Sequence, residues 1–180
     1  MNIFIPMTGY GSRFVAAGYR ELKPFIPVMG KPVIEWIVKG MYPEDVQFIF
    51  VCRGEHLRND PSMKGKLLAP GAIMVTIEDW VKKGPVYDVL RAYRALCAAE
   101  GFHREDGCII NYCDFYMTWD FQKFAEQAKA RDCAGAVPCY TGFHPNLLPQ
   151  DNFYASCLTD AEDNLVEIRE KYTFEQDKTK

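Results

Sequence analysis

Apolar runs alternate along the first 130 residues with segments whose apolar positions recur at helical spacing. Four near-continuous apolar runs, each bounded by turn residues, have the pattern of strands buried on both faces of a parallel sheet: 3–7, 46–52, 73–77 and 109–112. Helical spacing follows in three further segments: 32–40, 85–100 and the residues after Asp120, which is placed to cap a helix. This order predicts an α/β fold with a doubly wound, mostly parallel sheet.

The pattern changes near residue 133, where turns rich in Gly and Pro separate short expected strands at 135–139, 153–158 and 165–168. We expect a small β-rich C-terminal extension of the same domain, because a length of 180 residues favours a single domain spanning 1–180. In such folds, ligands bind beyond the carboxyl ends of the strands.

Composition narrows the class of protein. Hydrophobic residues make up 48% and charged residues 25%, which excludes a disordered or fibrous chain. The net charge of -3 gives no reason to expect nucleic acid as a partner. No basic region precedes the first apolar run, and no window approaches about 20 apolar residues, so we expect no membrane insertion and a cytoplasmic protein.

The sequence contains seven cysteines, an odd number without any Cys-x-x-Cys pair. Most stand within apolar runs. We therefore expect reduced, buried thiols, and neither a disulfide framework nor a zinc site.

The segment after the first expected strand carries the first candidate chemistry. Gly9 and Gly11 allow close backbone approach to a ligand, and the backbone N–H groups that lead into a helix form an anion site. Phe14 breaks the dinucleotide fingerprint, and Pro32 after Gly30-Lys31 breaks the P-loop pattern.

Two cations, Arg13 and Lys23, flank this loop and suit a triphosphate whose α-phosphorus is attacked. The alternative is a glycine turn with two solvated surface cations. Ser12 lacks the partners of a nucleophile and is placed to donate a hydrogen bond to phosphate.

Asp114 follows the apolar run 109–112 and so reaches the predicted ligand edge of the sheet. Mg²⁺ is commonly held by one or two carboxylates together with substrate phosphates, which makes Asp114 the candidate metal ligand. The alternative is an ordinary Asp in a strand-to-helix turn.

Together these motifs resemble the NTP-transferase family, whose members include sugar-1-phosphate nucleotidyltransferases and phosphocholine-type cytidylyltransferases. The resemblance spans nearly the whole chain and rests on this set: Gly9-x-Gly11-Ser12-Arg13-Phe14, Lys23-Pro24, Gly30-Lys31-Pro32, Gly84-x-x-x-Asp88-x-Leu90, Asp114 and Glu170-Lys171. The opening segment resembles branches that serve bacterial capsule and surface-polysaccharide pathways.

The resemblance implies transfer of NMP from an NTP to a phosphorylated acceptor, with release of pyrophosphate and with Mg²⁺ held by Asp114. Arg13 and Lys23 would neutralise charge on the pyrophosphate, and Gly84 would lie near the base or ribose. Glu170 and Lys171 would bind the acceptor, a sugar phosphate, phosphocholine or a similar molecule. His144 is a further candidate acceptor contact.

Base preference is expected from Glu78 and Asp79, which stand where relatives read the base edge. Carboxylates accept hydrogen bonds, which suits an amino group and favours CTP.

The main alternative is a nucleotide-binding module without catalysis. Family members usually add a second metal-binding aspartate downstream of the Glu-Lys pair, whereas only nine residues follow Lys171 and Asp177 is a poor substitute. The chain is then either a compact variant with one metal carboxylate or a fragment truncated at its C-terminus. A glycosyltransferase-like domain would need a paired Asp-x-Asp, which Asp114-Phe115-Tyr116 does not supply.

Overall fold

The computed structural model describes residues 1–67, 71–103, 107–142 and 154–174. Their contacts divide the chain into two compact units, residues 1–125 and 126–180, and each unit is described by itself.

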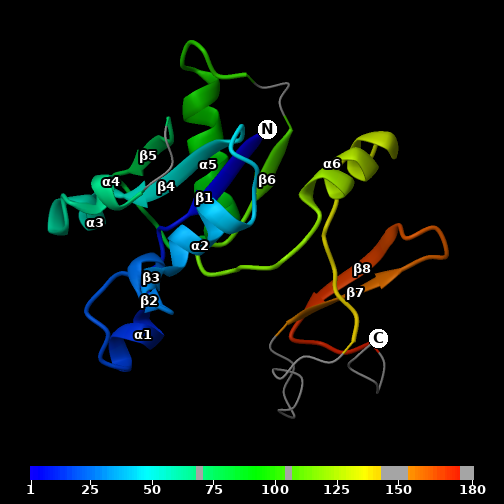
Figure 1. Ribbon diagram of the computed structural model, residues 1–180, viewed down its shortest axis with the longest axis horizontal. Coiled ribbons are helices and arrows are strands. Elements are labelled where there is room, and N and C mark those ends of the chain that lie inside the picture. The colour runs from blue at the N-terminus through cyan, green and yellow to red at the C-terminus, as the bar shows by residue number, and fades with distance from the viewer. Residues whose placement is uncertain (68–70, 104–106, 143–153, 175–180) are drawn as a thin grey trace. The chain divides into compact units, whose positions relative to one another are not determined.

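A four-stranded parallel sheet forms the centre of the first unit (Figure 1). Its strands, in spatial order, are β5 (Ile73–Ile77), β4 (Gln47–Arg53), β1 (Asn2–Pro6) and β6 (Cys108–Ile110). β1 pairs with both β4 and β6 in parallel register, so the segments that follow these three strands meet at one edge of the sheet. The α/β fold with a parallel sheet is confirmed.

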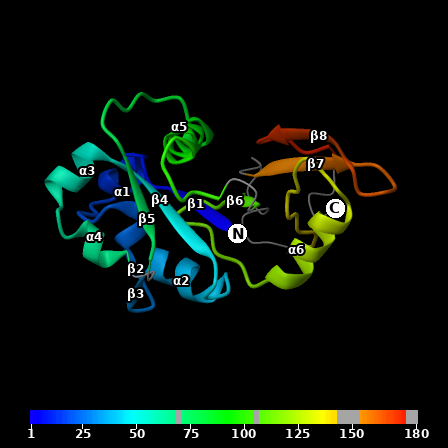
Figure 2. The same cartoon turned by 90° about the horizontal axis from the view of Figure 1, so that it is seen from above.

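Alternate residues of β1 and β4 build two separate cores. Ile3 and Ile5 pack with α2 (Val33–Gly40) through Ile34 and Ile37, whereas Phe4 packs with α5 (Pro85–Cys97). Figure 2 shows α5 on one side of the sheet and α2 on the other. This two-sided cover explains why the apolar runs are continuous and not alternating.

Shorter elements follow the strand ends. They are α1 (Ser12–Ala16), a 3-10 turn η1 (Lys23–Phe25), the antiparallel pair β2 (Pro27–Val28) and β3 (Lys31–Pro32), α3 (Gly54–Asn59) and α4 (Met63–Lys66). α6 (Phe121–Ala130) begins after Asp120, whose Oδ1 accepts a hydrogen bond of 3.0 Å from the Lys123 backbone N–H. The expected cap is confirmed.

The second unit contains an antiparallel hairpin, β7 (Ala155–Thr159) with β8 (Leu165–Glu170). Asp160 closes the hairpin turn, because its Oδ1 accepts hydrogen bonds from the backbone N–H groups of Glu162 and Asn164. The strand expected at 135–139 is wrong, because these residues form no ladder. Pro138 lacks the N–H that a strand would donate.

The cysteine expectation is corrected in part. None of the seven cysteines, all within the described residues, forms a disulfide, but only Cys52 and Cys113 are buried, while Cys108, Cys133 and Cys139 are exposed. Cys108 is exposed because it begins β6, an edge strand of only three residues. Within the described residues no helix has the length and apolarity needed to cross a membrane.

Removing side-chain volume beneath the sheet tests the core assignment. Ile37 is 0% exposed, so Ile37→Ala is expected to lower the free energy of unfolding by about 2–5 kcal/mol in urea denaturation. The same substitution at Ile110, which is 42% exposed, is expected to cost about 1 kcal/mol or less. Equal losses at the two positions would contradict this packing.

Candidate functional site

A cleft opens at the carboxyl ends of β1, β5 and β6, entirely within the first unit. Its volume is about 360 Å³. The residues that line it come from the segments after these strands and from the start of α5: Pro6, Met7, Thr8, Gly9, Tyr10, Gly11, Ser12, Arg13, Phe14, Lys23, Pro24, Trp80, Lys82, Gly84, Pro85, Asp88, Tyr112, Cys113 and Asp114. The loop, both cations, Gly84 and Asp114 therefore line one cavity.

Left-handed backbone at Gly11 shapes the loop. Gly11 has φ +63° and precedes the first residue of α1, a conformation that residues with a side chain rarely adopt. A Cβ at this position would meet the Lys23 Cβ at 3.5 Å, an ordinary contact, so the backbone conformation and not crowding is what requires glycine here. This turn places Ser12 and Arg13 at the end of the loop, in the first residues of α1.

Lys23 and Asp114 form an ion pair across the cleft wall, with Nζ 2.5 Å from Oδ2. Their side chains are 26% and 39% exposed, so both remain open to the cleft. The Lys23 Nζ also lies 5.7 Å from the centre of the Phe14 ring. Lys23 is therefore held in place, unlike a solvated surface cation. Among the described residues, the Arg13 side chain has neither a hydrogen bond nor an ion pair.

Asn111 fixes the turn that carries Asp114. Its backbone N–H continues the sheet by donating to the Phe4 carbonyl at 3.0 Å, and its side-chain Nδ2 donates to the Phe115 carbonyl at 3.3 Å. These bonds anchor both ends of the turn, so Asp114 leaves the sheet in a defined position.

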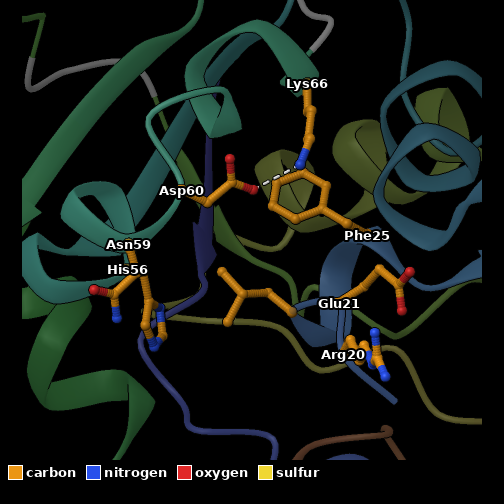
Figure 3. A pocket seen from close by; sticks show the side chains of 8 residues that line it. Arg20, Glu21, Phe25, His56, Asn59, Asp60 and Lys66 are labelled. Carbon is orange, nitrogen blue, oxygen red and sulfur yellow. Dashed lines mark hydrogen bonds and ion pairs between the residues drawn. The ribbon is translucent and has the colours of Figure 1, made fainter.

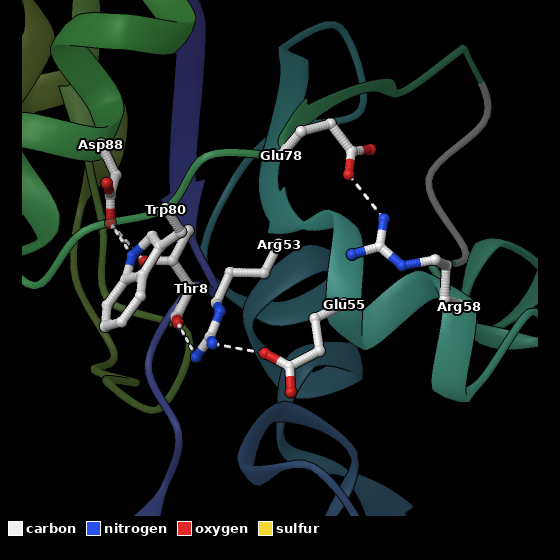
Figure 4. A network of polar contacts seen from close by, with 7 residues as sticks. All are labelled: Thr8, Arg53, Glu55, Arg58, Glu78, Trp80 and Asp88. Atoms are coloured by element: carbon white, nitrogen blue, oxygen red, sulfur yellow. Dashed lines mark hydrogen bonds and ion pairs between the residues drawn. The ribbon is translucent and has the colours of Figure 1, made fainter.

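Asp88 is the buried carboxylate of the cleft (Figure 4). Its Oδ2 accepts hydrogen bonds from the Thr8 hydroxyl at 2.5 Å and from the Trp80 Nε1 at 2.9 Å. Asp88 is only 1% exposed. It joins the segments after β1 and β5 to the first turn of α5.

Arg53, at the end of β4, holds the same segments from another direction. Its guanidinium carbon lies 3.7 Å from the centre of the Tyr10 ring and 4.1 Å from that of Trp80, both within cation–π range. Nη2 pairs with Glu55 at 2.6 Å (Figure 4). Arg53 is 3% exposed, so it positions the two rings and is itself covered.

The predicted base-reading carboxylates make other contacts. Glu78 pairs with Arg58 at 2.6 Å, and Asp79 pairs with Arg91, which holds the pKa of Asp79 below its usual value through the hydrogen bond. Neither is among the residues that line the cleft. Their contact with a nucleotide stays a prediction.

The predicted acceptor residues belong to the second part of the sequence. Glu170 ends β8, and Lys171 has φ +56° with its backbone N–H bonded to the Tyr154 carbonyl at 2.8 Å. Both belong to residues 126–180, and His144 lies outside the described residues. Their roles also stay predictions.

Sequence reasoning missed Thr8, Tyr10, Arg53 and Trp80 as parts of this site. It included Asp88 in a motif without giving it a role. Arg53 directly follows the apolar run 46–52 and ends β4, a position at the ligand edge that is a usable signal. Asp88 is an acid next to Val89 on the buried face of α5, which is a second usable signal.

The donor set suits a hard cation. Asp114 offers a carboxylate beside a cavity large enough for phosphates, and Mg²⁺ needs no more from a protein when waters and substrate phosphates complete its shell. In the part of the chain that the structure describes, no group of three or more His, Cys, Asp or Glu side chains is arranged to hold a metal alone. A metal here would therefore depend on the substrate.

Covalent catalysis by a thiol is unsuited to this cleft. Burial and the neighbouring Asp114 carboxylate raise the pKa of Cys113 to about 11. The thiol is therefore protonated at neutral pH and is a poor nucleophile.

The segment that carries Lys23 also borders a second cavity, of about 430 Å³ (Figure 3). Its lining residues are Arg20, Glu21, Leu22, Phe25, His56, Asn59, Asp60 and Lys66. Lys66 is paired with Asp60 at 2.6 Å. Burial and the charge of Arg53 hold the pKa of His56 below its usual value, so this histidine is neutral at pH 7.

Solved structures share the fold. A nucleoside-diphosphate-sugar pyrophosphorylase from Vibrio cholerae RC9 aligns with a TM-score of 0.67 and 16% identity, over 96% of this chain and 68% of that one. HddC from Yersinia pseudotuberculosis, complexed with GMP-PN, aligns at 0.62 and 17%, over 94% and 69%. A UDP-glucose pyrophosphorylase complexed with UDP-glucose aligns at 0.61 and 12%, over 95% and 68%.

No curated protein matches the sequence. The model of the MobA-like NTP transferase domain family matches residues 4–175, nearly the whole chain. With this match and with the loop, cations and carboxylate gathered in one cleft, the chain belongs to the MobA-like NTP transferase domain family and is a nucleotidyltransferase.

Proposed function

We propose that the protein transfers NMP from an NTP, with CTP favoured, to a phosphorylated small molecule and releases pyrophosphate. The acceptor is a sugar phosphate, phosphocholine or a similar phosphate, and the product supplies capsule or surface-polysaccharide synthesis in the cytoplasm. The observation that carries the proposal is the cleft in which Lys23, Asp114 and the Gly9–Arg13 loop meet. The solved pyrophosphorylases of the same fold support the acceptor class.

In the proposed reaction, an oxygen of the acceptor phosphate attacks the α-phosphorus. The bond from this phosphorus to the bridging oxygen breaks, and pyrophosphate leaves with the electron pair. Charge grows on the leaving group, so cations fixed near it lower the barrier. Lys23, already held by Asp114 and Phe14, and the unpaired side chain of Arg13 suit this role. Positioning and electrostatics supply the rate without a protein nucleophile.

Asp114 would hold Mg²⁺ together with substrate phosphates. The bound ion would supply Lewis-acid polarisation of a phosphoryl oxygen and orient the reacting groups. Lys23 Nζ contacts Oδ2 of Asp114, so the cation would share this carboxylate with the Lys23 ammonium.

A non-catalytic nucleotide-binding module is the second candidate. It is favoured by the single exposed carboxylate of the cleft and by the lack, among the described residues, of a metal cluster formed by protein alone. Calorimetry with CTP and Mg²⁺ separates the two functions, because the module binds nucleotide without turnover.

Substrate choice is tested with a panel of NTPs against sugar phosphates, phosphocholine and phospho-amino acids, with released pyrophosphate as the readout. CTP is expected to give the highest kcat/KM. Faster turnover of UTP or dTTP would overturn the CTP preference. Silence across the panel, with nucleotide binding retained, would favour the module.

Substitutions at the ion pair test the catalytic assignment. Lys23→Ala and Asp114→Ala are each expected to lower kcat/KM by about 100-fold or more, since each removes fixed charge at the reacting phosphates. Lys39→Ala is the matched control, because Lys39 is an exposed lysine paired with Glu35 outside the cleft. Circular dichroism checks that the variants stay folded. Normal activity in either cleft variant would remove that residue from the mechanism.

Metal dependence is tested by chelation. EDTA is expected to abolish pyrophosphate release, and added Mg²⁺ to restore it, because the cleft holds the cation only through Asp114 and phosphates. Asp114→Asn is expected to raise the Mg²⁺ concentration needed for half-maximal rate. A rate insensitive to EDTA would rule out the proposed metal.

A further inference from the structure

The two carboxylate oxygens of Asp88 differ in the hydrogen bonds that they accept. Oδ2 accepts both hydrogen bonds, from Thr8 and from Trp80, while Oδ1 is buried and has no hydrogen-bond partner in the described structure. The residue is 1% exposed and lines the cleft. A buried acceptor without a donor is costly, so a donor supplied by a bound ligand would stabilise Oδ1.

The two carboxylates of the cleft differ in their partners. Asp114 lies where β6 ends, on one side of β1, and is paired with Lys23. The side chain of Asp88 is bonded to Trp80, which follows β5 on the other side; among the described residues it has no ion-pair partner, although Lys82 also lines the cleft. A carboxylate without a paired cation repels phosphates, so we place the phosphates near Lys23 and the nucleoside near Asp88.

The surroundings of Asp88 suit a flat ring. Trp80 and Tyr10 line the cleft, and Tyr10 is 56% exposed even with Arg53 against its ring. Aromatic side chains of this kind offer stacking surfaces for a nucleobase. Such a base, and not the ribose alone, would bring its edge to the Asp88 carboxylate.

We propose that Asp88 Oδ1 accepts a hydrogen bond from the exocyclic amino group of the nucleobase, cytosine in the proposed reaction. The inference rests on the proposed function and names the residue that sets its base preference. Cytosine presents an amino group where uracil presents a carbonyl oxygen. The uracil carbonyl oxygen and the Asp88 carboxylate oxygen are both acceptors, with no hydrogen to share between them, so UTP is disfavoured.

Asp88→Asn tests this residue without removing its bonds. The amide oxygen still accepts from Thr8 and Trp80, and the amide N–H₂ takes the place of the free oxygen and donates to a carbonyl. Wild-type protein is expected to prefer CTP over UTP in kcat/KM by about tenfold or more, and Asp88→Asn to reduce that ratio by about tenfold or more. Asp60→Asn, which alters a carboxylate bonded to the Ser62 hydroxyl outside the cleft, is the matched control and should keep the wild-type ratio.

A second measurement needs no variant. The triphosphate of pyrimidin-2-one riboside is cytidine triphosphate with hydrogen in place of the amino group. Its kcat/KM with wild-type protein is expected to fall about tenfold or more below that of CTP. Equal use of the two nucleotides would overturn the proposal, as would an unchanged CTP-to-UTP ratio in folded Asp88→Asn.

The remaining outcomes are also decisive. If Asp88→Asn changes the ratio of CTP to dCTP and leaves CTP to UTP unchanged, the carboxylate reads the ribose and the base assignment is overturned. A wild-type preference for ATP would keep the amino assignment and overturn only CTP. If no NTP is turned over, the proposed function fails by itself, and calorimetric affinities for CMP and UMP still decide the role of Asp88.

Discussion

Parallel pairing of β1 with β4 on one side and β6 on the other is the constraint on which the cleft depends. Because all three strands run the same way, the segments from Thr8, Arg53 and Asn111 onward leave the sheet at the same edge. The two apolar cores, beneath α2 and beneath α5, hold this pairing rigid. The glycine loop starts from β1, whose position the sheet fixes, and leads into α1.

The charged side chains at the cleft are of two kinds, partly exposed and buried. Lys23 and Asp114 are partly exposed, so their pairing is exchangeable and each is available to substrate or cation. Arg53 and Asp88 are almost fully covered: Arg53 contacts the rings of Tyr10 and Trp80 and pairs with Glu55, and Asp88 Oδ2 accepts hydrogen bonds from Thr8 and Trp80. The exposed pair suits chemistry, whereas these two buried side chains position the walls of the cleft. Buried charges retained in this way are costly and are favoured where they fix a geometry.

Periodicity predicted much of the first unit because its signals are local. Continuous apolar runs mark strands covered on both faces, and Asp120 marks a helix start. The loop, Lys23 and Asp114 were predicted at one edge of the sheet because the ends of parallel strands converge, whereas Gly84 came only from the family resemblance. The strand expected at 135–139 failed because β pairing depends on a partner and on available N–H groups, which apolar content alone does not reveal. The ion pairs of Glu78 and Asp79 with Arg58 and Arg91 depend on tertiary placement, and no spacing in the sequence reveals them.

The indole of Trp80 has a particular environment among the three tryptophans of the chain. Its ring faces a guanidinium, and its N–H points to a carboxylate within the cleft wall. Trp36 and Trp119 instead donate to the backbone carbonyls of Val28 and Met41. Fixed charges beside an indole shift its emission, and the arrival of a polyanion or a second ring would alter that local field. Trp80 therefore gives this protein an intrinsic optical reporter of cleft occupancy.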